Sequence, residues 1–78
     1  MSSKPVSYYA EQIRHAKSKQ ELEQISYRAF RDDPQCMVNN PKMNRITAMC
    51  VLREVDLGYL PREPKSVSMY RRIAKTGK

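Results

Sequence analysis

Residues 40–58 read Asn-Pro-Lys-Met-Asn-Arg-Ile-Thr-Ala-Met-Cys-Val-Leu-Arg-Glu-Val-Asp-Leu-Gly. The Asn-Pro pair is typical of a helix N-cap followed by a first-turn proline. Gly58 closes the stretch and is the residue type favoured just past a helix end. We therefore predict a helix from Pro41 to about Leu57. Its apolar side chains cover much of the helical circumference, which indicates a central helix packed on more than one side. They are Met43, Ile46, Ala48, Met49, Cys50, Val51, Leu52 and Val55.

The preceding segment predicts two shorter helices. The first is expected over about residues 5–17, because Tyr9, Ile13 and Ala16 fall at i, i+4 and i+7 on one helical face. The second begins at a capping box, Ser18-Lys19-Gln20-Glu21, in which the serine hydroxyl and the glutamate carboxylate each accept from a backbone N–H at the helix start. It is expected to stop near residue 31, because residues 32–34 read Asp-Asp-Pro and favour a turn.

A fourth helix is expected after a proline-rich turn at residues 59–64. Ser66 is its predicted cap, and Val67, Tyr70 and Ala74 mark one face as far as about Lys75. The fold class is therefore all-α: a small single-domain bundle of about four helices, with the third helix central. Residues 1–78 form that one helical domain, and residues 61–78 form a basic C-terminal helix and tail.

The net charge is +7, and its distribution is uneven. Residues 1–40 carry six Lys or Arg against five Asp or Glu, whereas residues 61–78 carry six against one. A clustered basic segment attracts phosphates, acidic protein surfaces or anionic lipid. The contact surface is therefore expected in residues 61–78.

The sequence has no pattern typical of an enzyme. Its two glycines, Gly58 and Gly77, build no phosphate-binding loop. His15 is the single histidine and has no nucleophile placed beside it by any motif, so we interpret it as a surface residue. Asp32 and Asp33 are interpreted as turn chemistry. We expect no catalytic residue and no cofactor.

The two cysteines also favour a plain structural interpretation. Cys50 lies in the most apolar stretch and is expected to be buried and inert, whereas Cys36 is expected in a loop and is the better candidate for modification. The spacing of Cys36, Cys50 and His15 does not match a zinc motif, so no metal site is predicted. The chain also has no apolar run of about 18 residues and no signal-peptide pattern, so we expect a cytoplasmic protein with no membrane partner.

The basic segment has one plain structural interpretation, a solvated helix face that keeps a small protein soluble, and two functional hypotheses. The first is a nucleic-acid-binding protein, with lysines and arginines on phosphates and Tyr70 stacking on a base or sugar. If DNA is bound, the last helix and tail are the expected contact, because Glu21 and Glu23 at the start of the second helix would be repelled by phosphate. The predicted contact residues are Arg62, Lys65, Tyr70, Arg71, Arg72, Lys75 and Lys78.

The second hypothesis is a protein-interaction module, an inhibitor or adaptor that binds an acidic surface of a larger host or replication protein. Exposed tyrosine and methionine side chains are typical of such interfaces. The candidates are Tyr8, Tyr27, Met37, Tyr59 and Met69. A homodimer is a further option for a chain with so small a core. If the basic residues join Lys42, Arg45 or Arg53 on one face, nucleic acid is favoured over protein.

Two stretches resemble those of a group of small accessory proteins. Residues 17–30, Lys-Ser-Lys-Gln-Glu-Leu-Glu-Gln-Ile-Ser-Tyr-Arg-Ala-Phe, and residues 51–60, Val-Leu-Arg-Glu-Val-Asp-Leu-Gly-Tyr-Leu, resemble small uncharacterised proteins of bacterial plasmids and phages. The resemblance covers about half of the chain and includes no functional motif. It implies an accessory or regulatory role in a mobile genetic element and assigns no role to any residue.

Overall fold

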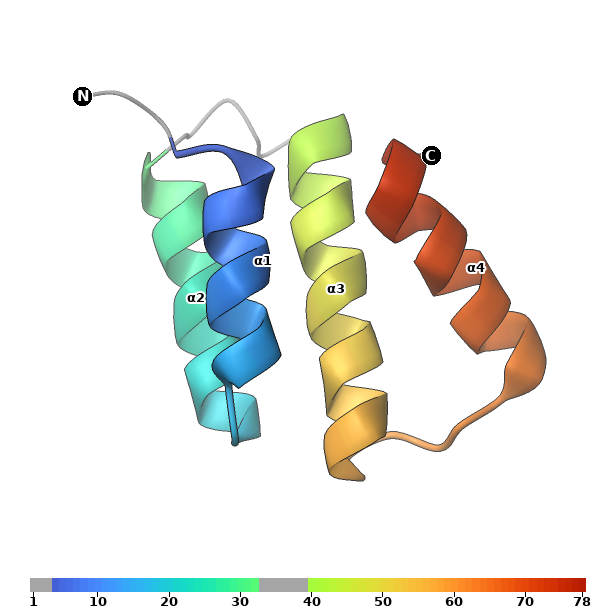
Figure 1. Cartoon of the computed structure of the whole chain (residues 1–78). Helices are drawn as coiled ribbons and strands as arrows, with labels where there is room; N and C mark the ends of the chain where they lie inside the picture. Colours follow the sequence, from blue (N-terminus) through green and yellow to red (C-terminus); the bar gives the residue numbers. More distant parts are fainter. Residues whose placement is uncertain (1–3, 33–39) are drawn as a thin grey trace.

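The computed structural model describes residues 4–32 and 40–78 and contains four helices in that part of the chain (Figure 1). They are α1 (Val6–His15), α2 (Lys19–Asp32), α3 (Pro41–Leu57) and α4 (Pro64–Thr76). Helix α3 stands between the α1–α2 pair and α4, and it contacts all three. This confirms an all-α bundle with the third helix central. Cys36 and Met37, and the loop predicted around them, lie outside the described residues.

One apolar core joins α1, α2 and the facing side of α3. The buried positions repeat at the spacing expected of amphipathic helices, so each helix turns one face inward. Tyr9 is the largest buried side chain of α1, and its hydroxyl donates to Asp32 Oδ2 at 3.0 Å. That bond satisfies the polar tip of a buried ring and ties α1 to the last turn of α2. The cluster comprises Tyr9, Ile13, Ala16, Leu22, Ile25, Ala29, Ile46 and Cys50.

The predicted capping box forms at the start of α2, with one difference. The backbone N–H of Glu21 donates to Ser18 Oγ at 3.2 Å, as expected. The carboxylate of Glu21 accepts from the N–H of Lys17 at 2.6 Å rather than from that of Ser18. The α1–α2 turn is therefore closed one residue earlier than the standard box, which ends α1 at His15, short of the predicted residue 17.

The α1–α2 turn is also fixed to α3. The guanidinium of Arg53 donates from Nε to the carbonyl oxygen of Ala16 at 2.9 Å. Ala16 follows the last residue of α1, where carbonyl groups lack partners within the helix. Arg53 is half-buried, and its guanidinium group is engaged in this hydrogen bond within the fold.

Among the described helices, α4 contacts α3 alone. Ala48 of α3 is fully buried, although it lies outside the main core cluster. At the C-terminal end of α4, Asn44 donates to the carbonyl oxygen of Gly77 at 3.0 Å, and Arg45 donates to that of Ala74 at 2.9 Å. These two bonds satisfy carbonyls that a helix end leaves free. They hold this end of α4 against the first turns of α3.

The predicted N-cap of α4, Ser66, was wrong by three residues. The helix begins at Pro64 with Glu63 as N-cap, whereas Ser66 lies within the first turn and donates to Glu63 Oε2 at 3.4 Å. Proline is favoured at the first helical position because its missing N–H needs no partner there. The predicted end of α3 is confirmed: Gly58 has a left-handed φ of 89°, and its N–H donates to the carbonyl of Val55 at 3.1 Å.

Candidate nucleic-acid interface

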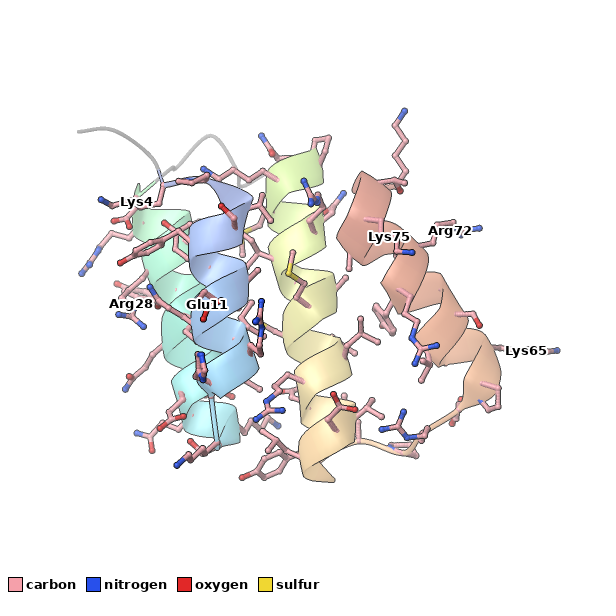
Figure 2. All side chains as sticks on the ribbon, viewed as in Figure 1. Lys4, Glu11, Arg28, Lys65, Arg72 and Lys75 are labelled. Atoms are coloured by element: carbon pink, nitrogen blue, oxygen red, sulfur yellow. The ribbon has the colours of Figure 1, made fainter. Side chains whose placement is uncertain are left out.

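The exposed half of α4 consists of two adjacent rows of side chains. The first, which we call the outer row, is Lys65, Met69, Arg72 and Thr76, spaced at i, i+4, i+7 and i+11. The second, the flank row, is Pro64, Ser68, Arg71 and Lys75. All eight residues are exposed. The opposite side of α4 contains buried Val67 and half-buried Ala74 and faces α3. Figure 2 shows Lys65 and Arg72 pointing away from the rest of the bundle.

The basic side chains of this surface have no acidic partner. Within residues 4–32 and 40–78, no ion pair or hydrogen bond involves the side chains of Lys65, Arg71, Arg72, Lys75 or Lys78. Helix α4 itself contains no Asp or Glu. The nearest carboxylate in sequence, that of Glu63, lines the α3-facing side of the helix together with Val67. Among the described residues, the four cations of the outer and flank rows are therefore not compensated by a carboxylate.

Most cations elsewhere in the described chain are engaged. Arg14 pairs with Glu11 at 3.3 Å, Arg31 lies 4.0 Å from Asp32, and Arg28 donates to Gln12 at 3.0 Å. Lys17 and Lys19 on the α1–α2 side are exposed and have no side-chain partner among the described residues. These two lysines provide a charge-matched control for the α4 cations.

Two of the seven predicted contact residues lie apart from the other five. Arg62 precedes α4 and pairs with Asp56 of α3 at 2.8 Å, so its charge is already compensated. Tyr70 is half-buried on the side of α4 that faces α3, where it lines a groove with Val51 and Val55. The structure therefore brings Lys65, Arg71, Arg72, Lys75 and Lys78 together on or just beyond α4, and it turns the Tyr70 ring toward the bundle.

The α3 cations do not extend this surface. Arg45 and Arg53 are half-buried and donate to backbone carbonyl groups, and Lys42 is half-buried with a partner of its own. Of the residues predicted for a Tyr/Met patch, Met37 lies outside the described residues. Tyr8, Tyr27, Tyr59 and Met69 are exposed but come from four different segments, and α3 separates α4 from α1 and α2.

Two features of the α4 charges are unfavourable for helix stability. Lys65 lies in the first turn, where the helix dipole disfavours a cation. Arg71 and Lys75 are like charges at i and i+4, an arrangement that destabilises a helix by about 0.2–0.5 kcal/mol. Only Lys75 lies in the last turn, where a cation is favourable. A bound anion would relieve this repulsion.

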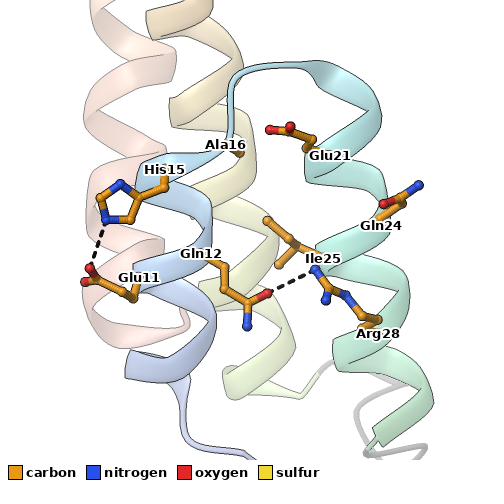
Figure 3. A pocket seen from close by; sticks show the side chains of 8 residues that line it. All are labelled: Glu11, Gln12, His15, Ala16, Glu21, Gln24, Ile25 and Arg28. Carbon is orange, nitrogen blue, oxygen red and sulfur yellow. Dashed lines mark hydrogen bonds and ion pairs between the residues drawn. The ribbon is translucent and has the colours of Figure 1, made fainter.

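The groove between α1 and α2 is a weaker candidate for a functional site than the exposed half of α4 (Figure 3). His15 Nε2 lies 3.0 Å from Glu11 Oε1, and the two side chains are 72% and 57% exposed. Both groups are thus in water, where an ion pair contributes little. No serine, threonine or cysteine is among the residues that line this groove. The interpretation of His15 as a surface residue is confirmed by its exposure.

Cys50 is buried, as predicted, between α2 and α3. Its Sγ lies 3.3 Å from Ser26 Oγ. Burial raises the pKa of the Cys50 thiol above its ordinary value of 9.0, against the smaller lowering effect of Ser26. A thiol held protonated in an apolar site is a poor nucleophile. No group of three metal-ligating side chains occurs in the part of the chain that the structure describes.

Among the described residues, no helix combines the length and the apolar character that crossing a bilayer requires. Comparison of the chain with protein-family models, curated proteins and solved structures found no match. The case for a functional site therefore rests on the charges, exposure and contacts of α4.

Proposed function

We propose that this protein binds nucleic acid through the exposed half of α4, as a small accessory or regulatory protein. The observation that carries the proposal is the set of five cations that have no carboxylate partner within residues 4–32 and 40–78. They are Lys65, Arg71, Arg72, Lys75 and Lys78. Lysine and arginine that neutralise phosphates release condensed counterions, and this release supplies affinity without any reading of sequence.

The placement of the acidic residues supports the same proposal. The carboxylates of Glu11, Glu21 and Glu23 lie on α1 and α2, on the far side of α3 from α4. Asp56 is paired with Arg62, and Glu63 is turned toward α3. Among the described residues, no carboxylate lies on α4 itself, so a phosphate backbone that approaches its exposed half would meet cations first.

A salt titration with charge-matched variants tests the proposal. The probe is a fluorescein-labelled DNA duplex of about 20 base pairs, followed by fluorescence anisotropy between about 50 and 200 mM salt. The double variant Arg71→Ala/Lys75→Ala is compared with Lys17→Ala/Lys19→Ala, which removes the same charge from the α1–α2 side. Circular dichroism verifies that both variants keep their helices.

We expect the wild type to bind with a log–log salt slope of several units. The α4 variant should reduce that slope by about 0.9 for each lost phosphate contact, and the control should leave it unchanged. Absence of binding at the lowest salt would refute the proposal. Equal losses of DNA affinity in the two double variants would show that DNA is attracted by the net charge of the protein alone. Equally effective competition by polyglutamate at matched charge would favour an acidic protein partner instead.

A further inference from the structure

An apolar groove lies between the C-terminal half of α3 and the first turns of α4, beside the linker that joins the two helices. Figure 1 shows α4 leaning away from α3 toward this end of the bundle. The apolar lining of the groove includes Val51, Leu52, Val55, Leu60, Val67 and Tyr70. Of these six side chains, Val67 alone is buried, so the other five keep apolar surface in contact with water.

The size of the groove favours protein side chains over a small molecule. Its volume is about 210 Å³, whereas sites for small molecules and cofactors typically enclose about 300–1,000 Å³. Tyr70 is half-buried in the groove, and its hydroxyl makes no hydrogen bond within the described residues. Tyrosine is enriched in protein–protein interfaces, where its ring packs and its hydroxyl finds a partner.

The apolar surface continues from the groove across α3 toward α1. Leu52 also lines the hollow between α1 and α3, together with half-buried Ala10 and Met49. On the linker, Tyr59 and Leu60 are 49% and 38% exposed. A standard interface buries about 800 Å² on each partner, or about one seventh of the 5540 Å² surface of this chain. Such an interface extends beyond the groove, and the α1–α3 hollow supplies further apolar surface for it.

The charges beside the groove indicate which partner fits. Residues 51–63 carry three Asp or Glu against two Arg, whereas residues 64–78 carry five Lys or Arg and no Asp or Glu. Arg62 pairs with Asp56 at 2.8 Å, while Glu63 lines the groove without a cation partner in the described parts of the chain. Two copies with a net charge of +7 repel each other. That repulsion is weakest where each copy presents carboxylates as well as cations.

We infer that two copies of this chain associate groove to groove about a two-fold axis. In a two-fold interface the same patch faces itself, so the patch has to be self-complementary. The apolar lining of one copy packs on that of the other, and Arg62 of each copy faces Glu63 of the other. The inference goes beyond nucleic-acid binding, because the interface uses the α3-facing side of α4 and leaves the outer and flank rows free.

Sedimentation equilibrium of the purified chain without DNA tests the inference. Between about 1 and 300 µM protein we expect a reversible monomer–dimer equilibrium with a Kd of about 10 µM. Leu60→Glu, on the exposed linker beside the groove, should raise that Kd at least about tenfold. Tyr27→Glu is the matched control, because Tyr27 is a 65% exposed residue of α2 and the variant changes the net charge equally. It should leave the Kd unchanged, and circular dichroism verifies that both variants keep their helices.

A charge exchange tests the two-fold geometry. Arg62→Glu should raise the Kd at least about tenfold, because carboxylates then face each other across the axis. The double variant Arg62→Glu/Glu63→Arg should restore dimerisation, because opposite charges face each other again. The fold tolerates the exchange: the Glu63 side chain makes no cap bond to α4, and the ion pair of Arg62 with Asp56 is exposed.

The results that would overturn the inference are specific. A monomer at every concentration would overturn it, and so would a dimer that Leu60→Glu leaves intact or that Tyr27→Glu weakens equally. Failure of Arg62→Glu/Glu63→Arg to recover the dimer would overturn the two-fold pairing. A dimer that binds no DNA would support this inference and refute the proposed function, whereas a DNA-binding monomer would do the reverse.

Discussion

Replacing Gly77 by alanine tests how α4 is attached to α3. Gly77 has a φ of 77°, in the left-handed region that alanine disfavours, and a Cβ there would lie 2.7 Å from Pro41 Cβ and 2.8 Å from Pro41 Cα. Gly58 is a matched control, because it has a φ of 89° at the end of α3, and a Cβ added to it would meet no atom within 4 Å. Both variants place an alanine at a left-handed φ, but only Gly77→Ala also brings a Cβ into steric overlap with Pro41.

The expected magnitudes follow from these distances. An alanine in the left-handed region destabilises the fold by about 1 kcal/mol, which is the whole expected effect of Gly58→Ala. In Gly77→Ala the overlap is relieved only if residue 77 moves away from Pro41. That movement breaks the 3.0 Å bond from Asn44 to the Gly77 carbonyl, which contributes about 1 kcal/mol. We therefore expect a total loss of about 2 kcal/mol.

Urea unfolding followed by far-ultraviolet circular dichroism measures the difference. With an m-value of about 1 kcal/mol/M, the midpoint of Gly77→Ala should lie about 1 M below that of Gly58→Ala. Adding Asn44→Ala to Gly77→Ala should lower the urea midpoint little further, because the Asn44 hydrogen bond is already broken in Gly77→Ala. Equal midpoints for the two glycine variants, or full additivity with Asn44→Ala, would refute the packing of Gly77 on Pro41.

Three further predictions concern the core helices. Ser18→Ala should destabilise the fold by about 1 kcal/mol by removing the cap of α2, and a change below about 0.3 kcal/mol in urea unfolding would contradict the observed bond. Arg53→Ala should lower the free energy of unfolding by about 1–2 kcal/mol by freeing the Ala16 carbonyl, whereas Arg14→Ala, which removes an exposed ion pair, should lower it by less than about 0.5 kcal/mol; equal effects would argue against the Arg53 contact. Because folding raises the pKa of Cys50, its stabilising contribution is complete below the unfolded thiol pKa and is lost as pH rises from about 9 through the higher folded value. Stability measured by urea unfolding should therefore fall more steeply with alkaline pH in the wild type than in Cys50→Ala, and parallel pH profiles would contradict this prediction.

Local signals in the sequence were sufficient to predict the helices. The caps at Ser18, Asn40 and Gly58 act within one turn, so their partners are near in sequence. The start of α4 is harder to predict, because Ser66 is a typical N-cap while Pro64 carries the same first-turn signal as Pro41. Two capping signals two residues apart compete, and the proline restriction on φ decided the outcome.

The candidate interface was only partly predictable. The cation cluster follows from the count of charges, but the ion pair of Arg62 with Asp56 and the bonds of Arg45 and Arg53 to carbonyls depend on how helices cross. Periodicity correctly placed Tyr70 with Val67 on the inner face, which is the reason its predicted stacking role does not fit the exposed surface. Met69 follows Lys65 and precedes Arg72 at helical spacing, a signal that identifies the outer row from sequence.

The attachment of α4 through one face has an evolutionary consequence. Tyr9, Leu22 and Ile46 hold the first three helices together, and no side chain of the outer or flank row belongs to that core. Substitutions on these two rows can therefore change the proposed contact surface without first requiring a compensating mutation in the interior. Selection for a new binding target would act on eight surface positions while the fold stays constant, so relatives of this chain should diverge fastest along those two rows.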